Sequence, residues 1–165
     1  MSITKDLLTE LTQESVVTKK MLERIPADQY DWRPHPKSMS IHQLAGHIAE
    51  LPGWVSLAFN TEELDFEQNT YTPLVWDSNA TLLEHFEKAL ASGQQSLEQA
   101  TDEDLSPRWV LRSGKDIFLD ITKGGMVRQA LSQVIHHRAQ LGVYLRLLNI
   151  PIPGTYGPSA DEQTF

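Results

Sequence analysis

The sequence contains no cysteine at any of its 165 positions. This absence excludes a scaffold held by disulfides, a zinc site built from thiolates and a cysteine nucleophile. Any metal that the chain binds must therefore be held by nitrogen and oxygen ligands. A chain of this length buries roughly 70% of the surface that its unfolded form exposes, so it needs neither disulfides nor a structural metal to fold.

Positive charge is also scarce, with 14 Lys and Arg against 22 Asp and Glu and a formal net charge of −8. Domains that bind nucleic acids or anionic membranes typically carry basic patches, so the charge argues against both partners. The polar N-terminal segment MSITKDLLTELTQES lacks the apolar core of a signal peptide. No apolar run approaches the ~20 residues of a transmembrane helix. We expect one cytoplasmic domain over residues 1–165.

Four segments have the spacing of apolar residues that is typical of amphipathic helices. They cover about residues 2–24, 40–59, 79–99 and 125–148. Ser40 and Gln43 have the spacing of a capping box at the start of the second helix. Pro52 and Gly53 predict a kink within it. Asn79 is the expected N-cap of the third helix.

The segments between these helices are of two kinds. Residues 108–120 alternate around Ser113-Gly114 and predict a small β-hairpin. Residues 27–39 are rich in proline, and residues 60–78 contain an acidic run that we interpret as a solvated loop. The pattern predicts an all-α fold: a four-helix bundle with long crossover loops and a small β-hairpin before the last helix.

Two of the six histidines lie on the apolar faces of different predicted helices. His47 comes three residues after Leu44, and His137 comes three residues after Val134. A buried imidazole must find partners for both ring nitrogens. Each is therefore either a hydrogen-bonded core residue or a ligand-binding group, and the pattern leaves both interpretations open.

The last predicted helix carries a polar stripe made of Gln133, His137, Gln140 and Tyr144, at spacings of four, three and four. Such a stripe is costly to bury unless a metal, a ligand or a hydrogen-bond network satisfies it. The alternative is that it faces a dimer partner or solvent. The motifs H-E-x-x-H, E-x-x-H, G-x-G-x-x-G and G-x-S-x-G are missing. A mononuclear metal site with nitrogen and oxygen ligands is the enzymatic interpretation that remains.

Two segments together resemble the DinB-like (DinB/YfiT-like) family, whose members are regarded as metalloenzymes: LAGHIAELPGW at 44–54 and HHRAQLGVYLRLL at 136–148. DWRPHPKSMS at 31–40 and PIPGTYGPSADE at 151–162 are also similar to this family. The resemblance covers nearly the whole chain. It implies a helical bundle, often a homodimer. Three histidines would bind a divalent metal such as zinc or nickel, one from the second helix and an H-x-x-x-H pair from the last.

The resemblance places the metal ligands at His47, Gln133 and His137, with Gln133 where the first histidine of the pair is expected. A glutamine oxygen suits hard cations better than zinc or nickel. Three alternatives follow: Gln133 binds through its oxygen, His47 and His137 hold the metal with water alone, or the site is metal-free. His136 lies about 100° around the helix from His137 and is a poor substitute. We expect a weakened or conditionally occupied site.

The resemblance also implies a reaction class. A metal with open positions lowers the pKa of a bound water or thiol, and the wider superfamily includes transferases and an isomerase that use a low-molecular-weight thiol. We therefore expect a transferase with an external thiol, or a hydrolase, in a stress-response setting. Glu50, Arg138, Gln140 and Tyr144 are candidates to support the ligands or contact a small-molecule substrate. The alternative is a non-catalytic dimer or small-ligand-binding protein that has lost full metal binding.

Overall fold

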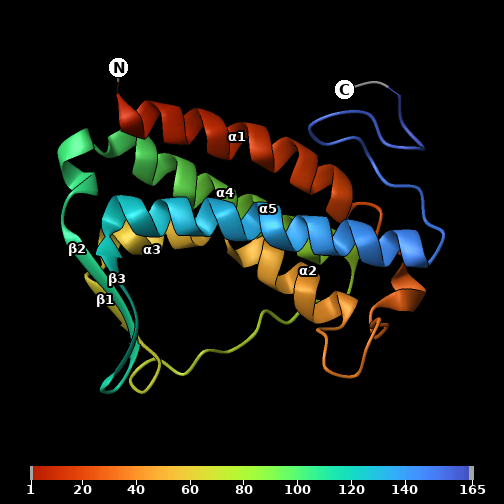
Figure 1. Cartoon of the computed structure of the whole chain (residues 1–165), viewed down its shortest axis with the longest axis horizontal. Coiled ribbons are helices and arrows are strands. Elements are labelled where there is room, and N and C mark those ends of the chain that lie inside the picture. Colours follow the sequence, from red (N-terminus) through yellow and green to blue (C-terminus); the bar gives the residue numbers. More distant parts are fainter. Residues whose placement is uncertain (1, 164–165) are drawn as a thin grey trace.

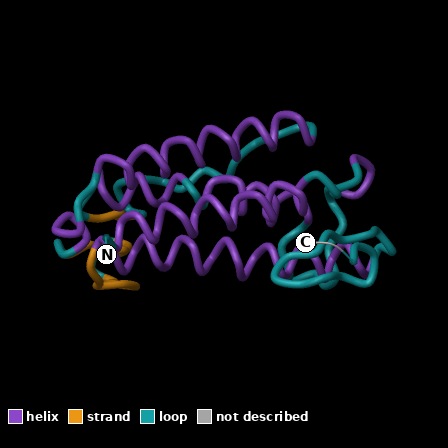
Figure 2. Tube along the Cα trace, turned by 90° about the horizontal axis from the view of Figure 1, so that it is seen from above, coloured by secondary structure: helices purple, strands orange, loops and turns teal. Residues whose placement is uncertain are grey.

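The structure is a computed structural model that describes residues 2–163. Over this range the α-helices are α1 (Ile3–Leu22), α2 (Ile41–Glu50), α3 (Gly53–Asn60), α4 (Asn79–Gln99) and α5 (Lys123–Leu147). The strands are β1 (Glu63–Asp65), β2 (Arg108–Ser113) and β3 (Asp116–Thr122), and the short 3-10 helices are η1 (Ala27–Gln29) and η2 (Asp102–Leu105). The long helices α1, α4 and α5 run along the molecule, and the sheet lies at one end of it (Figures 1 and 2). No helix in residues 2–163 is long and apolar enough to cross a membrane.

The expectation of an all-α four-helix bundle is wrong. The second predicted helix is two helices, α2 and α3, so residues 2–163 contain five α-helices. The acidic segment expected to be a solvated loop supplies β1, which pairs in parallel with β2, while β2 and β3 form the predicted antiparallel hairpin. The result is a three-stranded mixed sheet in the order β1-β2-β3, and the fold is α+β, although most of it is helical.

Asp65 explains why part of the acidic segment is ordered. Its side chain is only 2% exposed, and it accepts hydrogen bonds from the backbone N–H groups of Glu67 and Gly114. Arg112 places Nη1 2.7 Å from its carboxylate. The hydrogen bond from Gly114 is the main cause that lowers the pKa of Asp65 below its ordinary value, against the opposing effect of burial. These contacts join β1 to the hairpin turn, where Gly114 has a φ of 55°.

The start of α2 confirms the predicted capping box. Ser40 Oγ accepts a hydrogen bond from the Gln43 backbone N–H at 3.2 Å, and Gln43 Oε1 accepts one from the Ser40 backbone N–H at 2.9 Å. At the other end Pro52 has no N–H to continue the helix. The Trp54 N–H instead donates to the carbonyl of Leu51, three residues back. The predicted kink is therefore a break between two helices.

The N-cap of α4 corrects a second expectation. Ser78, not Asn79, caps the helix, because Ser78 Oγ accepts a hydrogen bond from the Thr81 backbone N–H. Asn79 is the first helical residue, and its side chain donates to the Ile25 carbonyl and accepts from the Tyr30 hydroxyl. The amide of Asn79 thus ties α4 to the segment that follows α1. The predicted ranges of the first, third and last helices agree with α1, α4 and α5 to within two residues.

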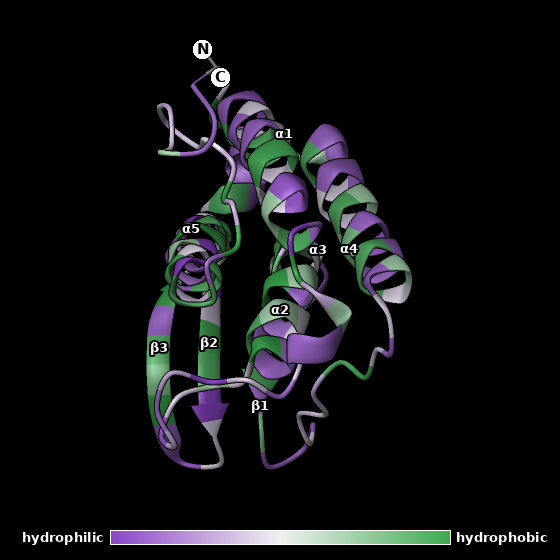
Figure 3. Cartoon of the chain, turned by 90° about the vertical axis from the view of Figure 1, so that its right-hand side faces the viewer, coloured by the Kyte–Doolittle hydropathy of each residue, from purple (hydrophilic) through white to green (hydrophobic). Residues whose placement is uncertain are grey.

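The buried side chains form two clusters. One surrounds Leu44 and Phe86, where α2, α4 and the C-terminal part of α5 meet, and the other surrounds Leu11 and Trp109, next to the sheet. Figure 3 shows the helices nearly end-on, with α5 above the sheet strands and α2 between α5 and α4. Because α2 packs on α5, polar side chains on these two helices can meet at the edge of the core.

Gly93 lets α4 pass close to the break between α2 and α3. A Cβ at this position would lie 2.4 Å from the Pro52 carbonyl oxygen and 3.3 Å from Val55 Cβ. Alanine would recover about 1 kcal/mol of helix propensity, but it would push α4 off the backbone of Pro52. We expect Gly93→Ala to lower the free energy of unfolding in urea by about 1–3 kcal/mol net.

Gly53→Ala is the matched control for this change. A Cβ at Gly53 would meet only Ala89, at an ordinary contact distance of 3.5 Å. We expect the control to stay within about 0.5 kcal/mol of the wild type. Equal losses in the two variants would contradict the close approach at Gly93.

Candidate metal centre

His47 of α2 and His137 of α5 meet at the edge of the core. Their ring centroids lie 4.9 Å apart, and the ring planes are inclined by 72°. Both side chains are half-buried. The two histidines that helix periodicity placed beside apolar stripes therefore meet from separate helices in the structure.

Each imidazole is held at Nδ1 by a residue one turn further along its own helix. His47 Nδ1 lies 2.6 Å from Glu50 Oε1, and His137 Nδ1 lies 2.7 Å from Gln140 Oε1. An oxygen acceptor at Nδ1 keeps the proton on that nitrogen and leaves the lone pair on Nε2. Across residues 2–163 no hydrogen bond joins either Nε2 to the protein, and no fully buried side-chain nitrogen or oxygen lacks a partner. Both Nε2 atoms are thus open to solvent or to a ligand.

The environment of His137 favours its neutral form. Burial lowers the pKa of His137, because removing an imidazolium from water costs free energy. The hydrogen bond with Gln140 opposes this effect, and the nearby His47 and His136 add to it. The neutral imidazole is the form that binds metals.

Tyr71, from the loop between β1 and α4, extends the hydrogen bonding at His47. Its hydroxyl donates to Glu50 Oε1 at 2.7 Å. Burial, followed by this hydrogen bond, raises the pKa of Tyr71 well above its ordinary range, so the hydroxyl remains a donor. Trp54 of α3 lies edge-on to His47, with ring centroids 6.3 Å apart. Sequence reasoning missed both residues, because neither the loop nor the position of α3 follows from local periodicity.

The donor set at this centre is small. Gln133 lies one turn before His137 on α5 and is half-buried, so it shares a face of the helix with His137. In the described part of the chain no group of three or more His, Cys, Asp or Glu side chains is placed to hold a metal. With Gln133 as a third ligand, two imidazole nitrogens and one amide oxygen would suit a divalent cation that keeps open positions, and they would not suit a closed structural site.

Of the four residues expected to support the site, two contact the histidines. Glu50 and Gln140 hold the rings at Nδ1. Tyr144 is buried instead in the core, edge-on to Trp32 at 5.6 Å. Arg138 forms a buried ion pair with α1 and does not belong to the centre.

The other histidines have separate positions. His136 is exposed, although its ring lies 4.9 Å from that of His137. His42 packs against the loop before α4: its ring stacks on Trp76 at 4.5 Å, and Nε2 lies 2.8 Å from the Trp76 carbonyl oxygen. His35 and His85 are exposed.

Comparisons with known proteins identify relatives of the chain. It is 28% identical over 130 residues to the uncharacterized protein YjoA of Bacillus subtilis, an alignment that covers 79% of this chain and 80% of YjoA. The crystal structure of YjoA superposes with a TM-score of 0.68 at 24% identity, covering 96% of this chain and 99% of that one. A DinB-like protein from Bacillus cereus has a TM-score of 0.72 at 21% identity, covering 94% and 98%. A mycothiol-dependent maleylpyruvate isomerase has a TM-score of 0.60 at 10% identity, covering 84% of this chain and 60% of that one.

The structural matches show a shared fold, and the family assignment comes from the sequence. The model of the DinB family matches residues 1–164. This match confirms the resemblance carried by residues 44–54 and 136–148. The chain belongs to the DinB family.

Proposed function

We propose that the protein is a divalent-metal-dependent enzyme whose metal is bound by Nε2 of His47 and His137, with Gln133 as a weak third ligand. The observation that carries the proposal is the meeting of two imidazoles that are each held at Nδ1 and open at Nε2. Zinc and nickel are the metals that imidazole ligands suit best here. Once bound, the metal would supply Lewis acidity that lowers the pKa of a thiol or water at its open position.

The protein residues around the centre orient the ligands. Glu50 Oε1 accepts a hydrogen bond from the Nδ1–H of His47, and the Tyr71 hydroxyl donates to the same carboxylate oxygen. Gln140 Oε1 accepts a hydrogen bond from the Nδ1–H of His137 in the same way. Partners of this kind fix the ring orientation and raise the basicity of the free nitrogen.

The thiol in the proposed reaction comes from outside the chain, because the sequence has no cysteine. A transferase that uses a low-molecular-weight thiol is our preferred reaction, supported by the fold that the chain shares with a protein described as a mycothiol-dependent isomerase. Hydrolysis by water is the competing reaction. We extend the proposal to a homodimer that acts on a small molecule, as the family resemblance implies.

Zinc titration calorimetry on untagged, chelator-treated protein tests the centre. We expect zinc binding by the wild type, none by His47→Ala or His137→Ala, and wild-type binding by the control His136→Ala. Glu50→Gln should weaken binding by about 10–100-fold, because the amide is a poorer acceptor for His47 Nδ1. The proposed centre is wrong if the wild type binds none of zinc, nickel and manganese, or if His47→Ala binds zinc as well as the wild type does.

Absence of metal binding in the same titration would favour a second function, and a cobalt spectrum separates the two enzymatic reactions. A non-catalytic small-ligand-binding protein is the second candidate, favoured by Gln133 and by the lack of a third His, Cys, Asp or Glu ligand in residues 2–163. With cobalt as the probe metal, a thiol such as N-acetylcysteine should give a thiolate-to-cobalt charge-transfer band in the wild type. Metal binding without this band would support the hydrolase over the transferase.

A further inference from the structure

A cavity of about 520 Å³ lies beside the metal centre, between α2, the start of α3 and the loop that leads from β1 to α4. Its volume falls within the roughly 300–1,000 Å³ of typical small-molecule sites. His47 belongs both to this cavity and to the candidate metal centre. A molecule in the cavity would therefore contact His47 and lie beside the histidine pair.

The chemistry of the cavity wall is unusual for such an acidic chain. No Asp, Glu, Lys or Arg lines it. Its walls are aromatic and aliphatic, with Trp54, Phe66 and Leu74 among them, and Gln43 adds one amide. An ion that entered it would lose water without gaining an opposite charge from the wall, which is unfavourable. The cavity therefore selects uncharged groups.

The rim of the cavity leaves large apolar side chains in water. Met39 is 44% exposed, Tyr71 45% and Val75 79%, and all three line this cavity. Exposed apolar groups that gather at one place mark binding sites more often than groups scattered singly. A bound apolar molecule would cover part of this surface.

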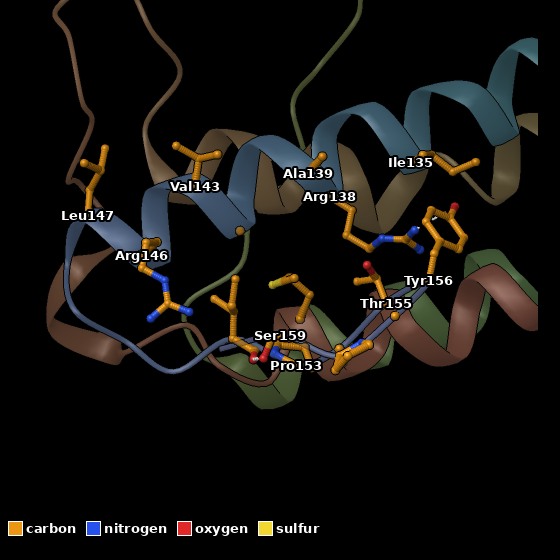
Figure 4. Close-up of a pocket in the computed structure, with 16 residues that line it drawn as sticks. Ile135, Arg138, Ala139, Val143, Arg146, Leu147, Pro153, Thr155, Tyr156 and Ser159 are labelled. Atoms are coloured by element: carbon orange, nitrogen blue, oxygen red, sulfur yellow. Dashed lines mark hydrogen bonds between the residues drawn. The ribbon is translucent and has the colours of Figure 1, made fainter. Parts of the chain in front are cut away.

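A second cavity of about 520 Å³ differs in charge. It lies between α5 and the C-terminal segment, and Arg138 and Arg146 line it together with apolar residues such as Val143 (Figure 4). Arg138 is paired with Glu14, and Arg146 with Asp161. None of the residues that line it belongs to the histidine pair. It provides an internal control of equal size.

We propose that the cavity beside His47 binds the body of an uncharged, aromatic or aliphatic organic substrate and presents its reacting end to the histidine pair. The assignment as a substrate site rests on the proposed function, because the reacting end needs the metal centre. Binding of the body needs only the apolar walls. An experiment can therefore disprove the apolar cavity without disproving the metal centre, and the reverse.

Two fluorescent probes of one skeleton test the selectivity of the cavity: the neutral N-phenyl-1-naphthylamine and its anionic 8-sulfonate. We expect chelator-treated protein to bind the neutral probe saturably and the sulfonate at least about tenfold more weakly. Met39→Glu places a carboxylate at the rim and should weaken binding of the neutral probe about tenfold. Val75→Glu, at a more exposed rim position, should also weaken binding of the neutral probe. Agreement between the two variants would show that the loss does not come from a folding defect in Met39→Glu.

Val143→Glu makes the matched change in the cavity of Figure 4 and should leave binding of the neutral probe unchanged. Equal affinity for the two probes would overturn the inference. So would a loss of binding in Val143→Glu but not in Met39→Glu or Val75→Glu. If zinc binds but the neutral probe does not, the inference fails and the metal centre stands. If the neutral probe binds but no metal does, the metal centre fails and the apolar site stands.

Discussion

Replacing Glu14 by alanine should lower the free energy of unfolding by about 3–5 kcal/mol, because it leaves a buried guanidinium without its counter-charge. Arg138 is 2% exposed and Glu14 7% exposed. Arg138 Nη1 lies 2.6 Å from Glu14 Oε2 and donates to Thr18 Oγ1 at 3.1 Å. The Tyr156 hydroxyl accepts from Arg138 Nη2 and donates to Glu14 Oε1. The ion pair thus joins α1, α5 and the C-terminal segment.

A second ion pair between the same two helices provides the control. Arg128 of α5 binds Glu10 of α1 through both terminal nitrogens of its guanidinium group, but the two side chains are 44% and 35% exposed. Glu10→Ala should therefore cost less than about 1 kcal/mol in the same urea unfolding experiment. The double variant Glu14→Leu with Arg138→Met should recover most of the lost stability, because no buried charge remains. Equal losses for Glu14→Ala and Glu10→Ala would show that the inner pair is not desolvated.

Gln133→His should raise the affinity for zinc by roughly two orders of magnitude, or about 2.8 kcal/mol of binding free energy. The substitution adds a third imidazole one turn before His137 and replaces a neutral oxygen that zinc binds poorly. The gain depends on His47 and His137, so it should vanish when His47→Ala is added. Calorimetric titration of the chelator-treated variants measures both changes.

Ser132→His is the matched control for this substitution. Ser132 is the neighbouring residue on α5, and its side chain is exposed. A histidine there adds the same side chain on another face of the helix, about 100° from that of Gln133. We expect its zinc affinity to equal that of the wild type. Equal gains in the two variants would mean that the added histidine acts at a surface site.

The sequence could predict the histidine pair because helix periodicity determines which residues share a face. His47 and His137 each lie between apolar residues at spacings of three and four. Glu50 and Gln140 were candidates together with Arg138 and Tyr144, and only these two, one turn along from their histidines, hold the rings. Periodicity does not say how helices pack, so the meeting of the two rings needed the structure.

The parts of the fold that the sequence did not predict depend on contacts between distant segments. The strand β1 is three residues long, too short for alternation to be recognised, and it pairs with β2 while Asp65 binds the turn at Gly114. Tyr71 reaches Glu50 only because the loop after β1 returns past α2 to α4 (Figure 1). The cavity beside His47 has the same origin, since that loop forms one of its walls.

Anomalous X-ray scattering from zinc in crystals of the untagged protein tests the metal centre most directly. We expect a peak at the zinc absorption edge about 2.0–2.1 Å from Nε2 of both His47 and His137, the usual zinc–imidazole distance. The peak should be weak or partly occupied in the wild type and strong in Gln133→His. Zinc-soaked Gln133→His crystals with no peak between α2 and α5, or with a peak bound only to His136, would contradict the proposed centre.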